Sequence, residues 1–179
     1  MKKKLLIVVD YQNDFVTGSL GFPGAEAIEQ NICDKIELYR SYGEAGQVIF
    51  TMDTHQADYM QTCEGKHLPV EHCIEDENGW QLFGKVADAI QDTDLMFKKP
   101  TFPSLELGNY LSGKDDEYDS VELAGVVTNI CVVSNMVIVK AALPNVDIVI
   151  DPKCVASFDE VMENKSFDLM ENLHAKVLR

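Results

Sequence analysis

The stretch SVELAGVVTNICVVSNMVIVKAA, residues 120–142, changes character halfway along its length. Its first part, Ser120–Gly125, is almost continuously apolar, which is typical of a strand buried on both faces of a parallel sheet. Its second part, Asn129–Ala142, has helical spacing, and we expect a helix there. A buried strand that leads directly into a helix is the repeating unit of α/β folds.

The rest of the chain repeats this alternation. Other short apolar runs are expected to be strands: Leu5–Val9, Gln47–Met52, Val146–Ile150 and, as a fifth candidate, Asp94–Phe97. Between and after them lie segments that we expect to be helices: Ala27–Tyr42, Trp80–Ile90, Leu105–Leu111 and Asp159–Leu173. The order predicts a doubly wound α/β fold with helices on both faces of the sheet. We find no repeat or linker, so we expect residues 1–179 to form one domain.

The composition and net charge limit the kinds of molecule that the protein is expected to bind. The net charge of −15 makes nucleic acid and anionic membrane surfaces poor partners. No apolar stretch approaches the about 20 residues that span a bilayer. Asp10 ends the first apolar run too early for a signal peptide, so we expect a cytoplasmic protein. The five scattered cysteines are then expected to be reduced.

Reactive side chains follow four of the predicted strands. Asp10 follows the first, Asp53-Thr54-His55 the second, Lys98-Lys99 the third, and the segment Val126–Cys131 the fourth. In open α/β sheets, sites form beyond the carboxyl ends of the strands. We therefore expect carboxylates, an imidazole, an ammonium group and a thiol to meet at one edge of the sheet.

Cys131 would lie in the first turn of the helix that begins at Asn129. Free backbone amides and the positive end of the helix dipole stabilise a thiolate in such a place. The same amides can bind the oxyanion of an acyl-transfer intermediate. A buried cysteine can equally be a small apolar residue of the core. Position alone leaves both interpretations open.

A thiol nucleophile also needs a proton acceptor. Only one of the four histidines, His55, follows a predicted strand, so Asp10 is the candidate base, with a strand-end turn residue as the alternative. Lys99 could lower the pKa of the thiol and stabilise an oxyanion, although most lysines are exposed. Its neighbour Lys98 competes for that role.

Asp53 and His55 are two residues apart in an extended segment, so their side chains point the same way. A carboxylate and an imidazole suit zinc, iron or manganese. The following loop, rich in Gly, Pro and charged residues, offers further candidate ligands: Glu64, His67, His72 and Cys73, of which Cys73 is expected to pack in the core. We therefore predict a divalent metal site here.

Five segments resemble motifs of the isochorismatase-like cysteine hydrolases, a family that includes the nicotinamidases. They are Asp10–Phe15 (D-x-Q-x-D-F), Thr51–His55 (T-x-D-x-H), Pro69–Cys73 (similar to P-x-H-C), Lys99-Pro100 with Phe102, and Gly125–Val132 (G-x-x-T-x-x-C-V). The resemblance runs from Leu5 to about His174 and keeps the order of the motifs. It implies a three-layer α/β/α fold with a mostly parallel central sheet.

The resemblance also implies a catalytic triad of Asp10, Lys99 and Cys131. Asp10 would accept the thiol proton, and Lys99 would hold the aspartate and the thiolate in place. Cys131 would attack an amide carbonyl to form a thioester, which water hydrolyses. The oxyanion would lie on the backbone amides of Cys131 and a nearby residue, next to a cis peptide between Val127 and Thr128.

For the metal, the resemblance implies Asp53, His55 and His72 as ligands of a divalent ion, with Glu64 as a fourth. Zinc is the first choice, and iron and manganese are alternatives. Phe15 would stack on the substrate ring. The resemblance further implies a homo-oligomer, either a dimer or a tetramer.

The chain departs from the family pattern around the expected pocket. The segment Glu75–Gly79 replaces a x-G-T-x-G turn, Leu68 replaces an aromatic residue, and Phe102-Pro103-Ser104 replaces S-A-F. The expected reaction is hydrolysis of nicotinamide to nicotinate and ammonia. The alternatives are another small amide or carbamoyl substrate, an isochorismatase-type vinyl ether, and a metal-binding protein without catalysis.

Overall fold

The computed structural model describes residues 2–179, which form a parallel sheet of six strands. The strands are β1 (Lys3–Val9), β2 (Gly46–Asp53), β3 (Leu95–Lys99), β4 (Tyr118–Val126), β5 (Asp147–Ala156) and β6 (Ala175–Val177). Their order across the sheet is β3-β2-β1-β4-β5-β6, so β1 and β4 lie at its centre. The short strands β3 and β6 form the two edges.

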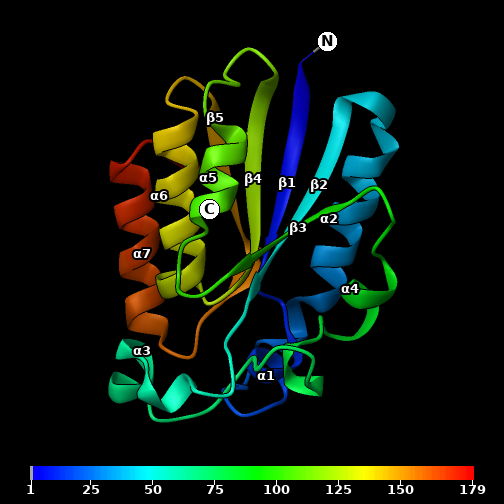
Figure 1. Ribbon diagram of the computed structural model, residues 1–179. Coiled ribbons are helices and arrows are strands. Elements are labelled where there is room, and N and C mark those ends of the chain that lie inside the picture. Colours follow the sequence, from blue (N-terminus) through cyan, green and yellow to red (C-terminus); the bar gives the residue numbers. More distant parts are fainter. Residues whose placement is uncertain (1) are drawn as a thin grey trace.

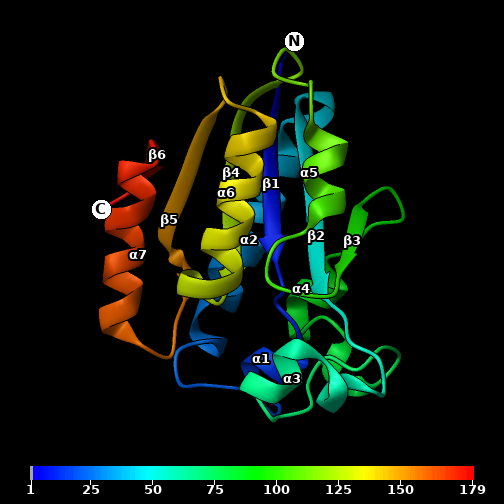
Figure 2. The same ribbon diagram turned by 60° about the vertical axis from the view of Figure 1, so that its left-hand side comes forward.

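Helices cover both faces of the sheet (Figures 1 and 2). One face carries α2 (Glu29–Ser41) and α4 (Gly84–Asp88), and the other carries α5 (Leu105–Leu111), α6 (Val133–Ala142) and α7 (Glu160–Asn172). Two short helices, α1 (Asn13–Val16) and α3 (Cys63–His67), lie beyond the carboxyl ends of the strands. The predicted three-layer α/β/α architecture is confirmed.

The central strands are apolar on both sides because both faces are covered. In β1, Leu6 and Val8 pack into the core beneath α2, whereas Leu5, Ile7 and Val9 pack into the core beneath α5 and α6. All five side chains are fully buried. The apolar run Leu5–Val9 is therefore continuous because the two faces of β1 pack into two different cores.

The connections reverse direction at the centre of the sheet. From β1 the chain moves through α2 to β2 and then to β3, whereas β4, β5 and β6 extend the sheet from the other side of β1. Neighbouring strands whose connections diverge leave a crevice beyond their carboxyl ends. This switch point between β1 and β4 is where the residues that follow Val9 and Val126 meet.

The predicted helices and strands are present in the structure, but their ends differ and the shortest elements were not predicted. The expected helix Trp80–Ile90 contains only α4, because Asn78–Trp80 forms a separate 3-10 turn. The expected helix Asn129–Ala142 opens with the π-helical turn Thr128–Val132 before α6 begins. The helices α1 and α3 and the strand β6 were not predicted. No helix within residues 2–179 is long and apolar enough to cross a membrane.

Candidate functional site

Four neighbouring strands deliver the predicted site residues to one place. Asp10 directly follows β1, Asp53 ends β2, Lys99 ends β3, and the turn with Cys131 follows β4. The sheet order places these strand ends next to one another. Close approach of β4 to β1 requires Gly125, which has φ of +112°, because a Cβ there would collide with the carbonyl oxygen of Val9.

The turn after β4 differs from the prediction by one residue. The cis peptide joins Val126 to Val127, not Val127 to Thr128 as the resemblance implied. The chain then enters the π-helical turn Thr128–Val132, in which Cys131 is buried. Two amides of this turn, those of Ile130 and Val132, donate to the carbonyl oxygen of Val127 at 3.0 and 3.1 Å. Cys131 therefore occupies a tight turn ahead of α6 and not the first α-helical turn.

Lys99 lies at the centre of a group of buried polar side chains. Its Nζ is 2.6 Å from Oδ2 of Asp10, 3.1 Å from Oδ1 of Asp53 and 3.7 Å from Sγ of Cys131. Lys99 is only 1% exposed and also donates to the carbonyl oxygen of Thr101. The structure thus brings together Asp10, Lys99 and Cys131 as predicted.

Lys98 points away from this group. Its Nζ lies 2.6 Å from Oε1 of Glu75 and 4.8 Å from the ring centre of Trp80, and half of its side chain is exposed. Adjacent residues of a strand face opposite sides of the sheet. Strand alternation therefore places Lys99, and not Lys98, in the buried group.

Burial and charge set the protonation states. Burial raises the pKa of the Cys131 thiol, and Lys99 opposes that shift without cancelling it. Burial also raises the pKa of Asp10, although the positive charge of Lys99 acts to lower it. Burial disfavours the charge of Lys99, but the charges of Asp10, of Cys131 when it is a thiolate, and of Asp53 outweigh it and raise the pKa of the lysine well above its usual value. Lys99 therefore remains a cation beside a neutral thiol.

Buried hydrogen bonds fix the positions of Asp10 and Asp53. Thr51 donates its hydroxyl to Oδ1 of Asp10 at 2.7 Å. The Gln12 side chain accepts from the backbone N–H of Asp53 at 2.8 Å and donates to its carbonyl oxygen at 2.9 Å. Asp10 itself adopts a positive φ of 48°, which is uncommon for a residue other than glycine. Thr51 and Gln12 lie in the quoted motifs, but their contacts with the aspartates depend on the folded structure and were not predicted.

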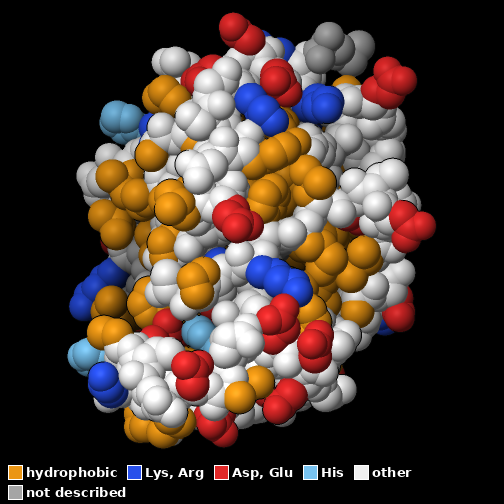
Figure 3. All heavy atoms as spheres, in the orientation of Figure 1, with side chains coloured by type: hydrophobic (Ala, Val, Ile, Leu, Met, Phe, Trp, Pro, Cys, Tyr) orange, Lys and Arg blue, Asp and Glu red, His pale blue; other side chains and the backbone are white. Residues whose placement is uncertain are grey.

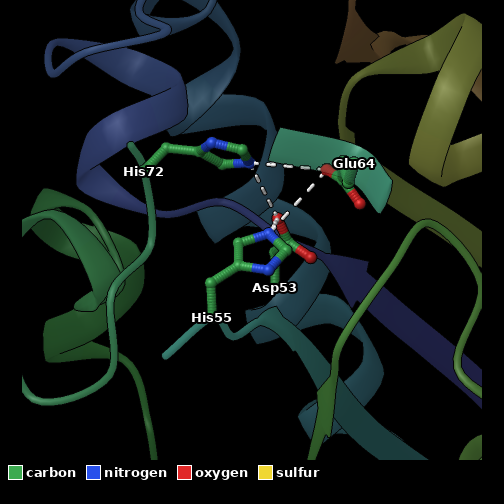
Figure 4. A group of neighbouring side chains, drawn as sticks. All are labelled: Asp53, His55, Glu64 and His72. Atoms are coloured by element: carbon green, nitrogen blue, oxygen red, sulfur yellow. Dashed lines mark hydrogen bonds and ion pairs between the residues drawn. The ribbon is translucent and has the colours of Figure 1, made fainter. Parts of the chain in front are cut away.

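Next to Lys99, four side chains converge on a single point (Figure 4). They are Asp53, His55, Glu64 and His72, and their ligand atoms all lie within 4.8 Å of one another. Asp53 Oδ2 is 3.0 Å from Nε2 of His55 and 3.3 Å from Nε2 of His72. Oε1 of Glu64 is 3.8 Å from both imidazole nitrogens. These are the four residues predicted as metal ligands.

The donors fit a divalent cation. Nδ1 of His72 lies 2.8 Å from the carbonyl oxygen of Val70, so Nδ1 carries the proton and Nε2 presents a lone pair to the cluster. Oε2 of Glu64 is buried and finds no hydrogen-bond partner among residues 2–179. Two imidazoles and two carboxylates form a mixed nitrogen and oxygen set that suits zinc, and also iron or manganese.

Capping explains how the loop presents Glu64. Thr62 precedes α3, and its hydroxyl accepts the backbone N–H of Gly65 at 3.0 Å. This cap fixes the first turn of α3, which carries Glu64. His72 is positioned by Asp14, whose Oδ2 accepts the N–H of Cys73 at 2.7 Å.

Some candidates stay outside the site. His67 is exposed and bonds to the carbonyl oxygen of Cys63, and Cys73 packs in the core beneath α2 as expected. Glu75, in the segment that departs from the family pattern, pairs with Lys98 and Gln56 and does not line the cavity described next.

A cavity of about 450 Å³ opens onto both groups. Cys131 lies in its wall, as do Asp53, Glu64 and His72 from the metal cluster. Phe15 also lines it, and the Phe15 ring meets the His72 ring edge-on at 5.6 Å. Phe15 thus forms part of the cavity wall beside the cluster.

Asn135 on α6 joins the segments that carry Lys99 and Cys131. This fully buried side chain donates to the carbonyl oxygens of Cys131 at 2.8 Å and Phe102 at 3.0 Å, and accepts the N–H of Ser104 at 2.9 Å. An amide side chain among the mainly apolar residues of α6 is the available signal in the sequence.

Comparison with known proteins adds to this geometry. The family profile described as Isochorismatase domain matches residues 4–179. A protein of Bacillus subtilis (strain 168) described as isochorismatase family protein PncA is 30% identical over 168 residues, which is 88% of each chain.

Two solved structures share the fold over almost the whole chain. The nicotinamidase/pyrazinamidase PncA from Bacillus subtilis is 27% identical, with a TM-score of 0.84 over 99% of this chain and 100% of that one. The pyrazinamidase/nicotinamidase from Streptococcus mutans is 25% identical, with a TM-score of 0.84 over 98% of this chain and 100% of that one.

Proposed function

Because this chain belongs to the isochorismatase family, we propose that it is a metal-assisted cysteine hydrolase that converts nicotinamide to nicotinate and ammonia. The family match confirms the resemblance predicted from the five motifs. The two nicotinamidase structures described above support the choice of substrate.

One observation carries the proposal. Cys131, with its charged partners Lys99 and Asp10, faces the same cavity as the cluster of Asp53, His55, Glu64 and His72. A core cysteine needs neither a buried ammonium group nor a buried carboxylate beside it. The combination is suited to attack on a carbonyl group whose substrate is oriented by the neighbouring cluster.

In the first half of the reaction, Cys131 acts as the nucleophile and Asp10 as the base. The thiol proton passes to Asp10, and the sulfur forms a bond to the amide carbon. Charge develops on the carbonyl oxygen, where the backbone N–H of Cys131 and a neighbouring N–H would bind it. When the C–N bond breaks, Asp10 returns the proton to nitrogen and ammonia leaves, so the acyl group remains as a thioester.

In the second half, a water molecule attacks the thioester carbon. Asp10 accepts one proton from the water and passes it to the sulfur as the C–S bond breaks. The second water proton leaves the product acid for solvent, and nicotinate forms. Lys99 remains protonated throughout, because its pKa is raised by the negative charge that Asp10 and Cys131 carry in turn and by the carboxylate of Asp53. Its role is to hold the charges of the triad in place and to stabilise the thiolate when it appears.

Asp53, His55, Glu64 and His72 would hold the divalent ion, for which zinc is our first choice. A bound ion supplies a positive charge that can orient a ring nitrogen or a water molecule. Asp53 also contacts Lys99 through Oδ1, so the same carboxylate links the cluster to the triad.

The setting we propose is the cytoplasm, which keeps thiols reduced, and all five cysteines are unpaired in the structure. The homo-oligomer implied by the resemblance stays a prediction.

An ammonia-release screen tests the proposed reaction. Metal-loaded protein should release ammonia from nicotinamide and pyrazinamide, and much more slowly from carbamoyl amino acids and aliphatic amides. If ammonia is released from the carbamoyl compounds alone, the substrate is a carbamoyl compound and not nicotinamide. If ammonia is released from none of these compounds, the amidase assignment is wrong.

A further inference from the structure

We propose that the cavity selects neutral aromatic amides with an apolar substituent on the side of the ring remote from the amide, and that it rejects amides that carry a carboxylate there. This inference rests on the proposed function and names the substrate class more narrowly. It follows from the size of the cavity, the composition of its outer wall and its charge.

The cavity is larger than a pyridine carboxamide requires. Its volume of about 450 Å³ lies in the range of about 300–1,000 Å³ that is typical of pockets for drug-sized ligands. Nicotinamide, a single ring with one amide, is smaller than such ligands. Sites that hold small ligands enclose most of the ligand surface, so the remaining space is suited to a larger substrate.

Much of the cavity wall is apolar and aromatic. This part of the wall includes Phe15, Leu20, Phe22, Phe102, Ile130 and Phe158. Phe22 comes from the loop after α1 and Phe158 from the loop before α7, and their rings meet edge to face at 6.0 Å. Two loops that are distant in sequence thus build one aromatic wall.

Two of these aromatic rings are exposed to solvent. Phe158 is 62% exposed and Phe102 is 43% exposed, although both line the cavity. Large apolar side chains exposed at the mouth of a cavity lose their contact with water when an apolar group binds against them. An alkyl substituent on the substrate would provide that contact.

The cavity offers no partner for a distal carboxylate. No described residue that lines it is a lysine or an arginine, and its two acids, Asp53 and Glu64, offset the charge of a divalent ion bound there. Lys99, the nearest buried cation, is paired with Asp10 and Asp53. Acidic side chains also gather on the surface around α1 (Figure 3). A carboxylate moved from water into this space would remain unpaired, which is costly.

Three related substrates test the proposal: nicotinamide, 5-propylnicotinamide and 5-carboxynicotinamide. Ring carbon 5 is the ring carbon that is adjacent neither to the ring nitrogen nor to the carbon that bears the amide. With metal-loaded wild-type protein, we expect kcat/KM for the propyl compound to be about tenfold above that for nicotinamide. For the carboxy compound we expect a value at least about tenfold below it.

Dissociation constants for metal-loaded Cys131→Ala, measured by calorimetry, separate binding from reactivity. The three compounds should show the same order of affinity. If they bind equally well while their rates differ, the selectivity lies in the chemistry and the proposal is wrong.

Variants of Phe158 localise the effect. Phe158→Ala should reduce the ratio of kcat/KM for propylnicotinamide to that for nicotinamide about threefold or more. Phe158→Arg should raise the ratio for the carboxy compound about tenfold, because it adds a cation to the mouth of the cavity. Val161→Ala, at an equally exposed position that does not line the cavity, should leave both ratios unchanged.

The outcomes distinguish this inference from the proposed function. If nicotinamide is hydrolysed and the propyl compound is no better, the selectivity proposal fails while the amidase assignment stands. If no ring amide is hydrolysed, both fail. Equal use of the carboxy and propyl compounds would overturn the charge argument.

Discussion

Two groups of buried charge can be compared in this sheet, one beneath α2 and one at the carboxyl ends of the strands. Beneath α2, Lys35 lies 2.7 Å from Glu122 on β4 and 3.0 Å from Asp151 on β5. Tyr39 donates its hydroxyl to Glu122 at 2.8 Å. Lys35 and Asp151 keep part of their side chains exposed, and none of the four residues lines the main cavity.

The second group has a similar composition but different surroundings. Lys99 again lies between two carboxylates, those of Asp10 and Asp53. Here the side chains of Lys99 and Asp10 are fully buried, a thiol lies within 3.7 Å of the ammonium group, and a cavity adjoins the cluster. The comparison teaches that a lysine between two carboxylates is not by itself a sign of function. The thiol and the cavity make the difference.

Removal of the thiol is expected to have the largest effect on activity. Cys131→Ala should lower kcat for nicotinamide by about 10⁴-fold or more, because the acyl group then has no acceptor. The variant should keep its metal content and its melting temperature, which atomic absorption and thermal unfolding would check. Activity within tenfold of wild type would remove the thiol from the mechanism.

Replacement of each of the two lysines by alanine, in separate variants, is the next test. Lys99→Ala should lower kcat/KM by about 10³-fold, because it leaves Asp10 and Asp53 without a counter-ion beside the thiol. Lys98→Ala, one residue away, should change kcat/KM by less than about threefold, because its ion pair with Glu75 lies at the surface. Comparable losses in the two variants would contradict the assignment of Lys99.

The metal cluster gives a third test. Asp53→Ala should lower metal affinity by at least about 100-fold and kcat/KM by a similar factor, because Asp53 serves both the cluster and Lys99. Equilibrium dialysis against zinc would measure the affinity. His67→Ala provides the control, since His67 lies outside the cluster and should leave zinc affinity unchanged. Equal zinc binding in the two variants would mean that the ligands lie elsewhere.

Asn135→Ala should lower kcat/KM about tenfold, because the segments carrying Lys99 and Cys131 lose their shared hydrogen bonds. The rate at which iodoacetamide alkylates Cys131, followed on its peptide by mass spectrometry, should fall, whereas a loss of stability alone would expose this buried thiol and raise the rate. Asn135→Asp retains the shape but presents a carboxylate to two carbonyl oxygens, and it should be no better than alanine. Wild-type kinetics in Asn135→Ala would show that the three bonds are structural only.

The group beneath α2 completes the comparison. Lys35→Met should reduce the free energy of unfolding by about 2 kcal/mol, because Glu122 loses its ammonium partner in a buried place. Urea denaturation would measure this, and kcat/KM at 25 °C should match wild type. A large loss of activity in the folded variant would mean that this group also takes part in catalysis.

The sequence alone indicated the fold and the identity of the converging residues. Apolar runs that end in Asp10, Asp53 and Lys99 signal strand ends, and parallel strands bring such ends to one edge. The position of the cis peptide was missed by one residue, because it depends on where β4 separates from β1. Asn135 was missed because its role depends on contacts with the distant segment Phe102–Ser104.

The short helices were missed for a related reason. The helix α3 has five residues and is stabilised by its cap and its tertiary contacts rather than by helix propensity. The strand β6 has three residues, too few to show a period, and pairs with β5 only once α7 has returned the chain to the sheet.

The most direct test of the account is to look for the acyl group on Cys131 during turnover. Metal-loaded protein mixed with nicotinamide and quenched in acid should carry a nicotinoyl group, and peptide mass spectrometry should place it on Cys131. The same peptide from Lys98→Ala should also be modified, and the alanine peptide from Cys131→Ala should not. Ammonia release at the full rate by Cys131→Ala, with no nicotinoyl group on the wild-type peptide, would contradict the thioester mechanism.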